Sequence, residues 1–428
     1  MNLKKIIILL LAGFILASVT WKVYDYQTNK KKYITEINEK EILNLDNIYA
    51  SSDKNITSFK ELISENPENI DIHIKLAAAY ILKANETCKP ELYSTAEEVL
   101  NKAIKIEPDN FLPYAMLGSI YNSKNHFKKG LEFSRKSLEL NPYSKYSNGI
   151  LSDAQIGLGM YEEAELTVNK MKDTKPDIDT YSRISSINEL NGESQNAVDA
   201  MRIAIASGSP VAEKTARCRV QLGNLFYDKG DIETAGQIFG FVMKDFPEYV
   251  HGYGAMGAIK MHNKDYQGAI DLYKKALEKN ILPGFLISLG DAYALSGNKE
   301  LAEEQYQNAR SVLVSYKQKG VDTDIEMAMF NADQDIELTQ SKETIENVLN
   351  NGSKSIQVYD ALAWLNYKLG NYDEAQKNIE LALRLGTRDP LMYYHAGKIY
   401  EKSGKTDRSE EYLDFALKIN PFYEILYK

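Results

Sequence analysis

The sequence is poor in the residue types from which catalytic and metal sites are built. Its 428 residues include two cysteines and five histidines, and the histidines form no His-Glu-x-x-His motif. No Gly-x-Ser-x-Gly motif and no phosphate-binding glycine loop are present either. We therefore expect this chain to have no catalytic residues, no metal ligands and no cofactor site.

Basic charge is scarce in most of the chain. Residues 1–32 hold six lysines and one aspartate, whereas the rest of the chain has 45 basic and 59 acidic side chains, a net charge of −14. An acidic body repels the phosphate backbone of DNA and RNA. The composition therefore predicts that nucleic acid is not a partner.

The sequence has one long apolar run, which lies near its start. Lys4 and Lys5 precede the run Ile6–Val19, an order typical of export signals. Counted to Trp21, the run has 16 residues, slightly fewer than the roughly 20 that span a bilayer. We expect residues 1–24 to be a transmembrane anchor that holds the chain in the cell envelope, with the body outside the cytoplasm. The alternative is a cleaved signal peptide of bacterial type and a secreted product.

A pair of small residues recurs along the rest of the chain at a nearly fixed period. A glycine is followed five residues later by a small residue, and the interval from one glycine to the next is nearly constant where consecutive units can be compared. The pairs are Gly159/Ala164, Gly192/Ala197, Gly230/Ala235, Gly297/Ala302, Gly370/Ala375 and Gly404/Ser409. Such a period predicts a stacked array of one helical hairpin, in which the glycine ends the first helix of each unit. The two cysteines fall in separate units, so we expect them to be free thiols.

The first helix of each unit carries its own motif. A leucine or alanine precedes a glycine, and an aromatic residue follows three positions later, as in Leu117-Gly118 with Tyr121 and Leu289-Gly290 with Tyr293. Together with the segment 360–375, these motifs resemble the tetratricopeptide repeat. The resemblance implies an all-α fold, a right-handed α-solenoid of about ten helix-turn-helix repeats. We expect the units to begin at Ile70, Phe111, Lys145, Ile178, Ala216, Val250, Pro283, Asp322, Ile356 and Pro390.

The same resemblance divides the chain into segments. Residues 70–423 are expected to form the repeats, residues 25–69 a linker with N-terminal capping helices, and residues 424–428 a C-terminal tail. Because each hairpin of such an array is expected to bury its apolar side only against its neighbours, we expect an elongated, curved ribbon.

The resemblance also implies where a partner binds. Ligands of the family lie on the concave wall formed by the first helix of each unit, and an extended peptide or a helix is the natural occupant. Carried over by position, the expected partner-binding residues are Tyr146, Asn224, Tyr227, His251, Met261, Trp364, Tyr367 and Tyr394. Aromatic residues at these positions give large contact areas with a polar edge.

These observations predict a scaffold and not an enzyme, because the repeats leave no room for a catalytic domain. We expect it to bind a protein or peptide partner in the cell envelope and to reach the membrane through residues 1–24. An alternative remains open, in which tyrosines of the concave wall stack on sugars. The protein would then be a carbohydrate-binding factor or an accessory factor of polymer assembly or export.

Overall fold

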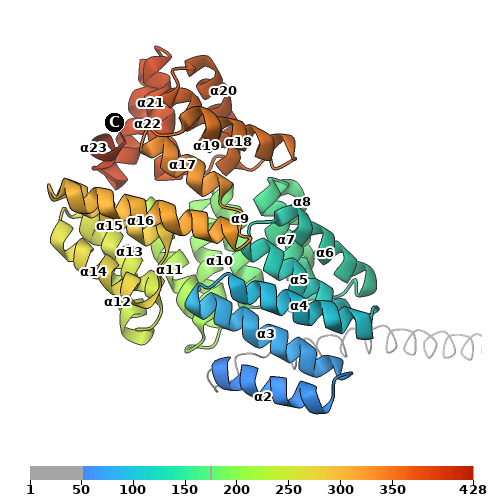
Figure 1. Ribbon diagram of the computed structural model, residues 1–428. Coiled ribbons are helices and arrows are strands. Elements are labelled where there is room, and N and C mark those ends of the chain that lie inside the picture. The colour runs from blue at the N-terminus through green and yellow to red at the C-terminus, as the bar shows by residue number, and fades with distance from the viewer. Residues whose placement is uncertain (1–51, 174–175, 428) are drawn as a thin grey trace, which may run out of the picture.

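The computed structural model describes residues 52–173 and 176–427. Within these ranges the chain forms 22 helices and no strand, and the helices stack as successive antiparallel hairpins (Figure 1). The all-α solenoid is therefore confirmed. Residues 1–24, expected to be an anchor or a signal, lie outside the described residues. No helix within the two ranges is both long and apolar enough to cross a membrane.

The first helix of each hairpin is called an A helix, and these helices carry odd numbers. They are α3 (Ile70–Thr87), α5 (Phe111–Ser123), α7 (Lys145–Leu158), α9 (Ile178–Leu190), α11 (Glu213–Asp228), α13 (Val250–His262), α15 (Pro283–Leu295), α17 (Asp324–Asp333), α19 (Ile356–Lys368) and α21 (Pro390–Lys402). Eight of these ten begin at the expected first residue of a unit. The exceptions are α11, which begins three residues early, and α17, which begins two residues late.

The second helix of each hairpin is called a B helix. The B helices are α4 (Glu91–Ile106), α6 (Phe127–Leu140), α8 (Tyr161–Lys172), α10 (Ser194–Ser207), α12 (Ile232–Asp245), α14 (Tyr266–Lys279), α16 (Lys299–Gln318), α18 (Leu338–Asn350), α20 (Tyr372–Ala382) and α22 (Thr406–Ile419). Helix α2 (Ser52–Glu65) precedes the first hairpin, and the short helix α23 (Tyr423–Leu426) follows the last.

Local sequence accounts for the helix ends. Asn110, Ser144 and Asp177 each precede an A helix, and their side chains accept a hydrogen bond from a main-chain N–H of the first turn. Gly159 ends α7 in the left-handed conformation, with φ of 76°. Ala164, five residues later, is fully buried where the two helices cross. The recurring pair therefore marks the turn and the crossing point of a hairpin.

The eighth hairpin makes the same turn without a glycine. Asp335 and Glu337, between α17 and α18, adopt φ values of 52° and 49°. Left-handed backbone is unfavourable for residues with a β-carbon. Ser341 occupies the crossing position and is buried, where its hydroxyl accepts a hydrogen bond from Asn331. A polar contact therefore replaces the small apolar contact that Ala164 makes in the third unit.

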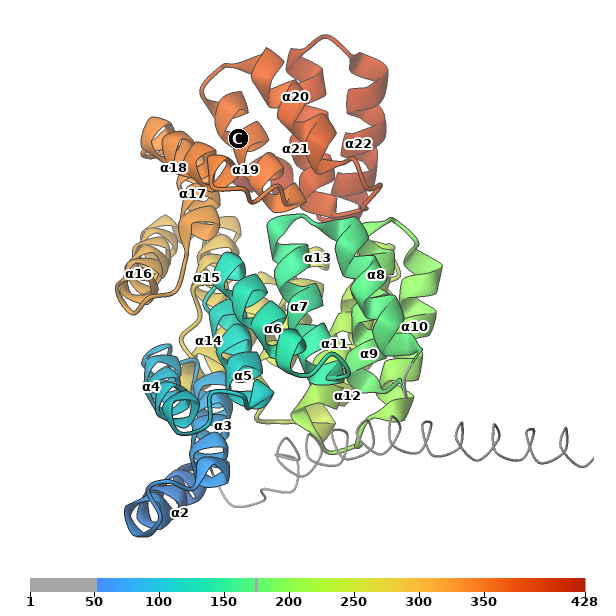
Figure 2. The same ribbon diagram turned by 90° about the vertical axis from the view of Figure 1, so that its right-hand side faces the viewer.

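The superhelix closes on itself, so the expectation of an elongated ribbon is wrong. Hairpins far apart in the sequence lie side by side, and the C-terminal hairpins sit against the middle of the array (Figure 2). The main-chain N–H of Asp322 donates to the carbonyl of Lys124 at 2.8 Å, and that of Lys354 donates to Leu158 at 2.9 Å. We call these the inter-turn contacts. They make the molecule a closed coil in which distant units pack together.

Both cysteines are free thiols, as the repeat pattern predicts. Cys218 is buried on α11, and Cys88 lies at the end of α3 in the left-handed conformation. Burial raises the pKa of both thiols. Neither side chain is therefore a reactive thiolate at neutral pH.

Candidate functional site

The inner side of the superhelix, formed by A helices, holds the C-terminal end of this same chain. Two contacts fix the point at which the chain leaves α22. The hydroxyl of Tyr227 donates to Oδ1 of Asn420 at 2.5 Å, and Nδ1 of His262 donates to the carbonyl of Ile419 at 2.6 Å. Tyr227 lies on α11 and His262 on α13, so the end of the last hairpin rests on helices from the middle of the chain.

Aromatic side chains surround the residues that follow. Tyr423 is 8% exposed, and its ring centroid lies 5.5 Å from that of Tyr394 and 5.4 Å from that of Tyr427. The hydroxyl of Tyr394 donates to the main-chain carbonyl of Tyr427 at 3.4 Å. Phe422 packs against both adjoining cores, one from α13–α17 and one from α17–α23. We call Asn420–Tyr427 the C-terminal plug.

Trp364 lies deeper in the wall beside the plug and is fully buried. Its ring stacks on those of Tyr367 and His395, with centroid distances of 4.8 and 4.2 Å. Its indole N–H donates to Asp333 at 2.9 Å, and Nδ1 of His395 lies 2.9 Å from Asp360. These contacts join α17, α19 and α21. Trp364 is therefore a core residue of three adjacent hairpins.

The eight predicted partner-binding residues fall into three groups by burial. Tyr227, Met261, Trp364 and Tyr394 are buried, and in the structure they contact this chain itself. Tyr146 and Tyr367 are partly buried, whereas Asn224 and His251 are exposed. The structure brings Trp364, Tyr367 and Tyr394 into one aromatic cluster and places Tyr227 on the plug. That these residues bind a partner stays a prediction.

Carboxylates on the inner side were missed by the sequence reasoning, which assigned paired acidic residues to the starts of B helices. Burial raises the pKa of Asp291 to about 7 and that of Asp333 to about 6. Glu189 keeps an exposed surface, but the protein crowded around it raises its pKa to about 7, and the nearby Asp389 adds to this. The sequence does show single acidic residues on the A helices. Their raised pKa values could not be predicted from it, because the surroundings of these residues depend on the closure of the superhelix.

Asp291→Asn is expected to raise the free energy of unfolding at pH 8 by about 2 kcal/mol. The pKa of Asp291 is about 7 in the folded chain, against about 4 for an unfolded aspartate. Folding therefore takes up a proton between these values, and the stability that the carboxyl contributes below pH 4 is lost as the pH rises through 7. The expected gain of about 2 kcal/mol is about half of the free energy that corresponds to the full difference in pKa, because water partly reaches this side chain. Urea unfolding at pH 5 and pH 8 measures it.

The matched control is Asp271→Asn, on the exposed side of α14. It is expected to change the stability by less than about 0.5 kcal/mol at either pH. Asparagine at position 291 keeps an oxygen for the hydroxyl of Tyr306, which donates to Asp291 at 2.8 Å. An equal gain from Asp291→Asn at pH 5 and pH 8 would contradict the raised pKa.

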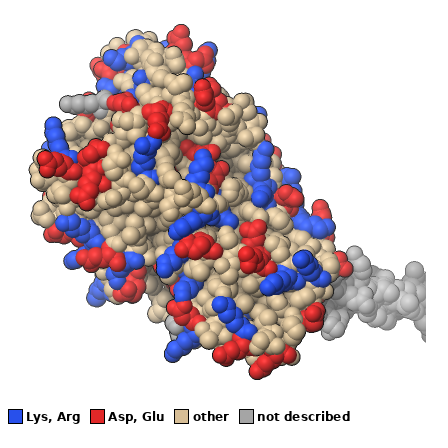
Figure 3. All heavy atoms as spheres, viewed as in Figure 1, with Lys and Arg blue, Asp and Glu red and all other residues tan. Residues whose placement is uncertain are grey.

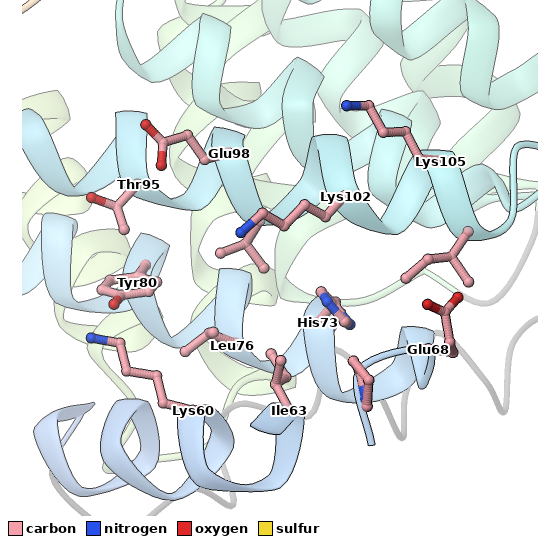
Figure 4. A pocket seen from close by; sticks show the side chains of 13 residues that line it. Lys60, Ile63, Glu68, His73, Leu76, Tyr80, Thr95, Glu98, Lys102 and Lys105 are labelled. Carbon is pink, nitrogen blue, oxygen red and sulfur yellow. The ribbon is translucent and has the colours of Figure 1, made fainter. Parts of the chain in front are cut away.

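A hollow of about 670 Å³ lies at the other end of the array, between α2, α3 and α4 (Figure 4). Ile63, Leu76 and Tyr80 contribute apolar surface to it, and Lys60 and Lys102 contribute charged ends. No motif predicted this hollow, because its walls come from three helices whose spacing is set by packing.

Charges of both signs are interspersed on the outer face shown in Figure 3. The molecule also has ion pairs between neighbouring hairpins, as Arg183 of α9 makes with Asp153 of α7 at 2.7 Å and Lys214 of α11 makes with Asp179 of α9 at 2.9 Å. This face carries no extended field of one sign. The expectation that the chain does not bind nucleic acid stays a prediction.

Comparison with known families identifies the repeating unit. Residues 113–144, 255–311 and 361–424 match models of the tetratricopeptide repeat. The chain contains tetratricopeptide repeats. Proteins built from tetratricopeptide repeats are generally protein-interaction scaffolds and are typically not enzymes.

Two relatives carry tetratricopeptide repeats as well. Human tetratricopeptide repeat protein 21B is 29% identical over 221 residues, which cover 50% of this chain and 16% of that protein. The TPR repeat-containing protein MJ1428 of Methanocaldococcus jannaschii is 24% identical over 377 residues, 74% of this chain and 65% of that protein. The chain thus spans less than two thirds of the length of either relative.

Among solved structures, human IFIT1, determined as a dimer with PPP-AAAA, superposes with a TM-score of 0.51 at 17% identity. The match covers 78% of this chain and 77% of IFIT1. At this identity the likeness shows a shared fold of stacked tetratricopeptide repeats.

Proposed function

We propose that this chain is a non-enzymatic scaffold that binds a peptide or a helix of a partner protein on the inner side of its superhelix. One observation carries the proposal. The inner side already holds a peptide-like segment, the C-terminal plug, through aromatic contacts and through side-chain donors to main-chain carbonyls. Every peptide has such carbonyls, so the same donors suit the backbone of another chain.

Two predicted partner-binding residues lie on the same A helices that contact the end of α22, and both are open to solvent. Asn224 on α11 and His251 on α13 are exposed. The ring of His251 lies 5.2 Å from that of Tyr249 and 5.7 Å from that of Phe285, measured between centroids. Crowding by the surrounding protein lowers the pKa of His251. The neutral ring offers one donor and one acceptor to a partner at pH 7.

Photo-cross-linking in cells tests the proposal. A photoreactive residue at Asn224 or at His251 is expected to capture the same partner, and sequencing of the cross-linked peptide identifies its segment. The matched control is a photoreactive residue at Phe241, which is 60% exposed on the B helix α12. Equal capture from Phe241 and from the two A-helix positions, or no protein captured at all, would count against the scaffold. Glycan captured at the A-helix positions would instead support the carbohydrate-binding alternative.

We propose the cell envelope as the location of this scaffold, on the sequence of residues 1–24 alone. Two lysines followed by Ile6–Val19 are typical of an export signal or anchor. Fractionation of the same cells is expected to place the full-length chain in the membrane. A product that lacks residues 1–24 in the soluble fraction would favour the secreted alternative.

A further inference from the structure

We propose that the C-terminal plug occupies the partner site of this chain, and that the partner segment shares its chemistry: two aromatic side chains four residues apart. This inference rests on the proposed function and adds the ligand and its competitor. Tyr423 and Tyr427 have the stated spacing, which places both rings on one side of a helical turn. Their ring centroids are 5.4 Å apart.

The plug is held by the surrounding helices and not by its own structure. Its helix α23 has four residues, far fewer than an isolated helix needs to be stable in water. Tyr423 is nearly buried, whereas Ile425, two residues later, is 58% exposed. This one-sided burial is the pattern of a short ligand that lies in a groove.

The contacts of the plug come from two helices distant in sequence, α11 and α15, and from α21 of the last hairpin. Tyr227 of α11 reaches Asn420, α15 packs beside α23, and Tyr394 of α21 contacts Tyr423 and Tyr427. The walls of this site therefore come from three A helices, and two of their residues belong to the set carried over from the tetratricopeptide-repeat motif. A peptide on these residues has to displace the plug, because the two cannot share the same volume.

The covalent link makes the plug a strong competitor. A segment tethered to its own site acts at an effective concentration of about 1 mM. A separate peptide with the same contacts is therefore largely excluded at micromolar concentration, and its apparent affinity falls by the fraction of molecules in which the site is open. Weakening the plug is expected to raise that affinity without any change in the site.

The test uses the full chain and a fluorescent synthetic peptide of residues 418–427 as the probe. The double variant Tyr423→Ala, Tyr427→Ala is expected to bind the probe at least tenfold more tightly than the unmodified chain, measured by fluorescence anisotropy. The matched control is Ile425→Ala, which alters the same short helix at its exposed position and is expected to bind like the unmodified chain. A probe with alanine at both tyrosine positions is expected not to bind the double variant.

Circular dichroism and thermal melting establish whether the double variant is folded. A folded double variant that binds the probe no better than Ile425→Ala would overturn the inference. If the double variant does not fold, Asn420→Ala takes its place, because it removes the hydrogen bond from Tyr227 in the plug and leaves both the site and the probe unchanged. An increase of about threefold in probe affinity is then expected, and an unchanged affinity would overturn the inference.

The outcomes separate this inference from the proposed function. If Asn224 and His251 capture a partner but the probe does not bind, the proposed scaffold function stands and the plug is not a competitor of the partner. A probe that binds the double variant, with no partner captured in cells, supports the site chemistry and refutes the scaffold. A dimer of the unmodified chain that Tyr423→Ala, Tyr427→Ala dissociates would assign the bound segment to a second copy and overturn the inference.

Discussion

Gly159→Ala is expected to destabilise the chain by about 3 kcal/mol or more and to loosen the closed superhelix. A β-carbon at this position would lie 2.3 Å from the main-chain carbonyl of Lys354, in a hairpin far away in the sequence. Main-chain atoms cannot move aside as a flexible side chain does. The two hairpins must separate, and the hydrogen bond from Lys354 to Leu158 is lost with its neighbours.

Gly370→Ala is the matched control for this prediction. Gly370 ends α19 with φ of 79°, against 76° at Gly159, and a β-carbon there meets nothing within 4 Å. Both substitutions therefore share the penalty of about 1–2 kcal/mol for alanine in left-handed backbone. The additional loss at Gly159 is the contribution of the inter-turn contact.

Two measurements check the result. Urea unfolding is expected to show a midpoint for Gly159→Ala well below that of Gly370→Ala. Small-angle X-ray scattering is expected to show a larger radius of gyration for Gly159→Ala alone. Equal midpoints and equal radii for the two variants would mean that the turns of the superhelix do not touch in solution.

Trp364→Ala is expected to lower the free energy of unfolding by about 4 kcal/mol. Removal of a fully buried indole leaves a cavity that the stacked rings of Tyr367 and His395 fill only in part. The carboxylate of Asp333 also loses the hydrogen bond from the indole N–H. Thermal melting and urea unfolding of the full chain measure the loss.

Trp364→Phe and Tyr143→Ala are the comparisons for this second prediction. Phenylalanine keeps a stacked ring and gives up only the hydrogen bond and part of the volume, so about half of the loss is expected. Tyr143 is an aromatic residue with 49% of its surface exposed, and its removal is expected to cost less than about 0.5 kcal/mol. A loss below about 1 kcal/mol for Trp364→Ala would show that Trp364 is not a core residue.

The helices and their order were accessible from the sequence because a hairpin is a local structure. Gly159 and Ala164 are five residues apart, and their roles as turn and crossing point need only the two helices that they join. The first residues of eight A helices followed from the same pattern. The eighth unit has no glycine in its turn, where Asp335 and Glu337 adopt the left-handed conformation, and its first helix α17 begins two residues later than expected.

The candidate site was only partly accessible. Their positions in the repeat correctly placed Tyr227 and Tyr394 on A helices. The repeat pattern did not predict the C-terminal plug, which both residues contact. The same reasoning offered Trp364 as a partner contact, although the structure buries it completely. An A helix has a buried side and an open side, and a residue near the boundary cannot be assigned without the neighbouring hairpins.

The sequence by itself determined the repeating hairpin, the first residue of eight A helices, and the absence of the motifs on which catalysis depends. Only the tertiary structure decided that the coil closes and that its inner side holds the C-terminal plug. The reason is cumulative geometry. Each hairpin is rotated by a small angle relative to the last, and these rotations add over about six units before Lys124 meets Asp322. No local pattern records that sum.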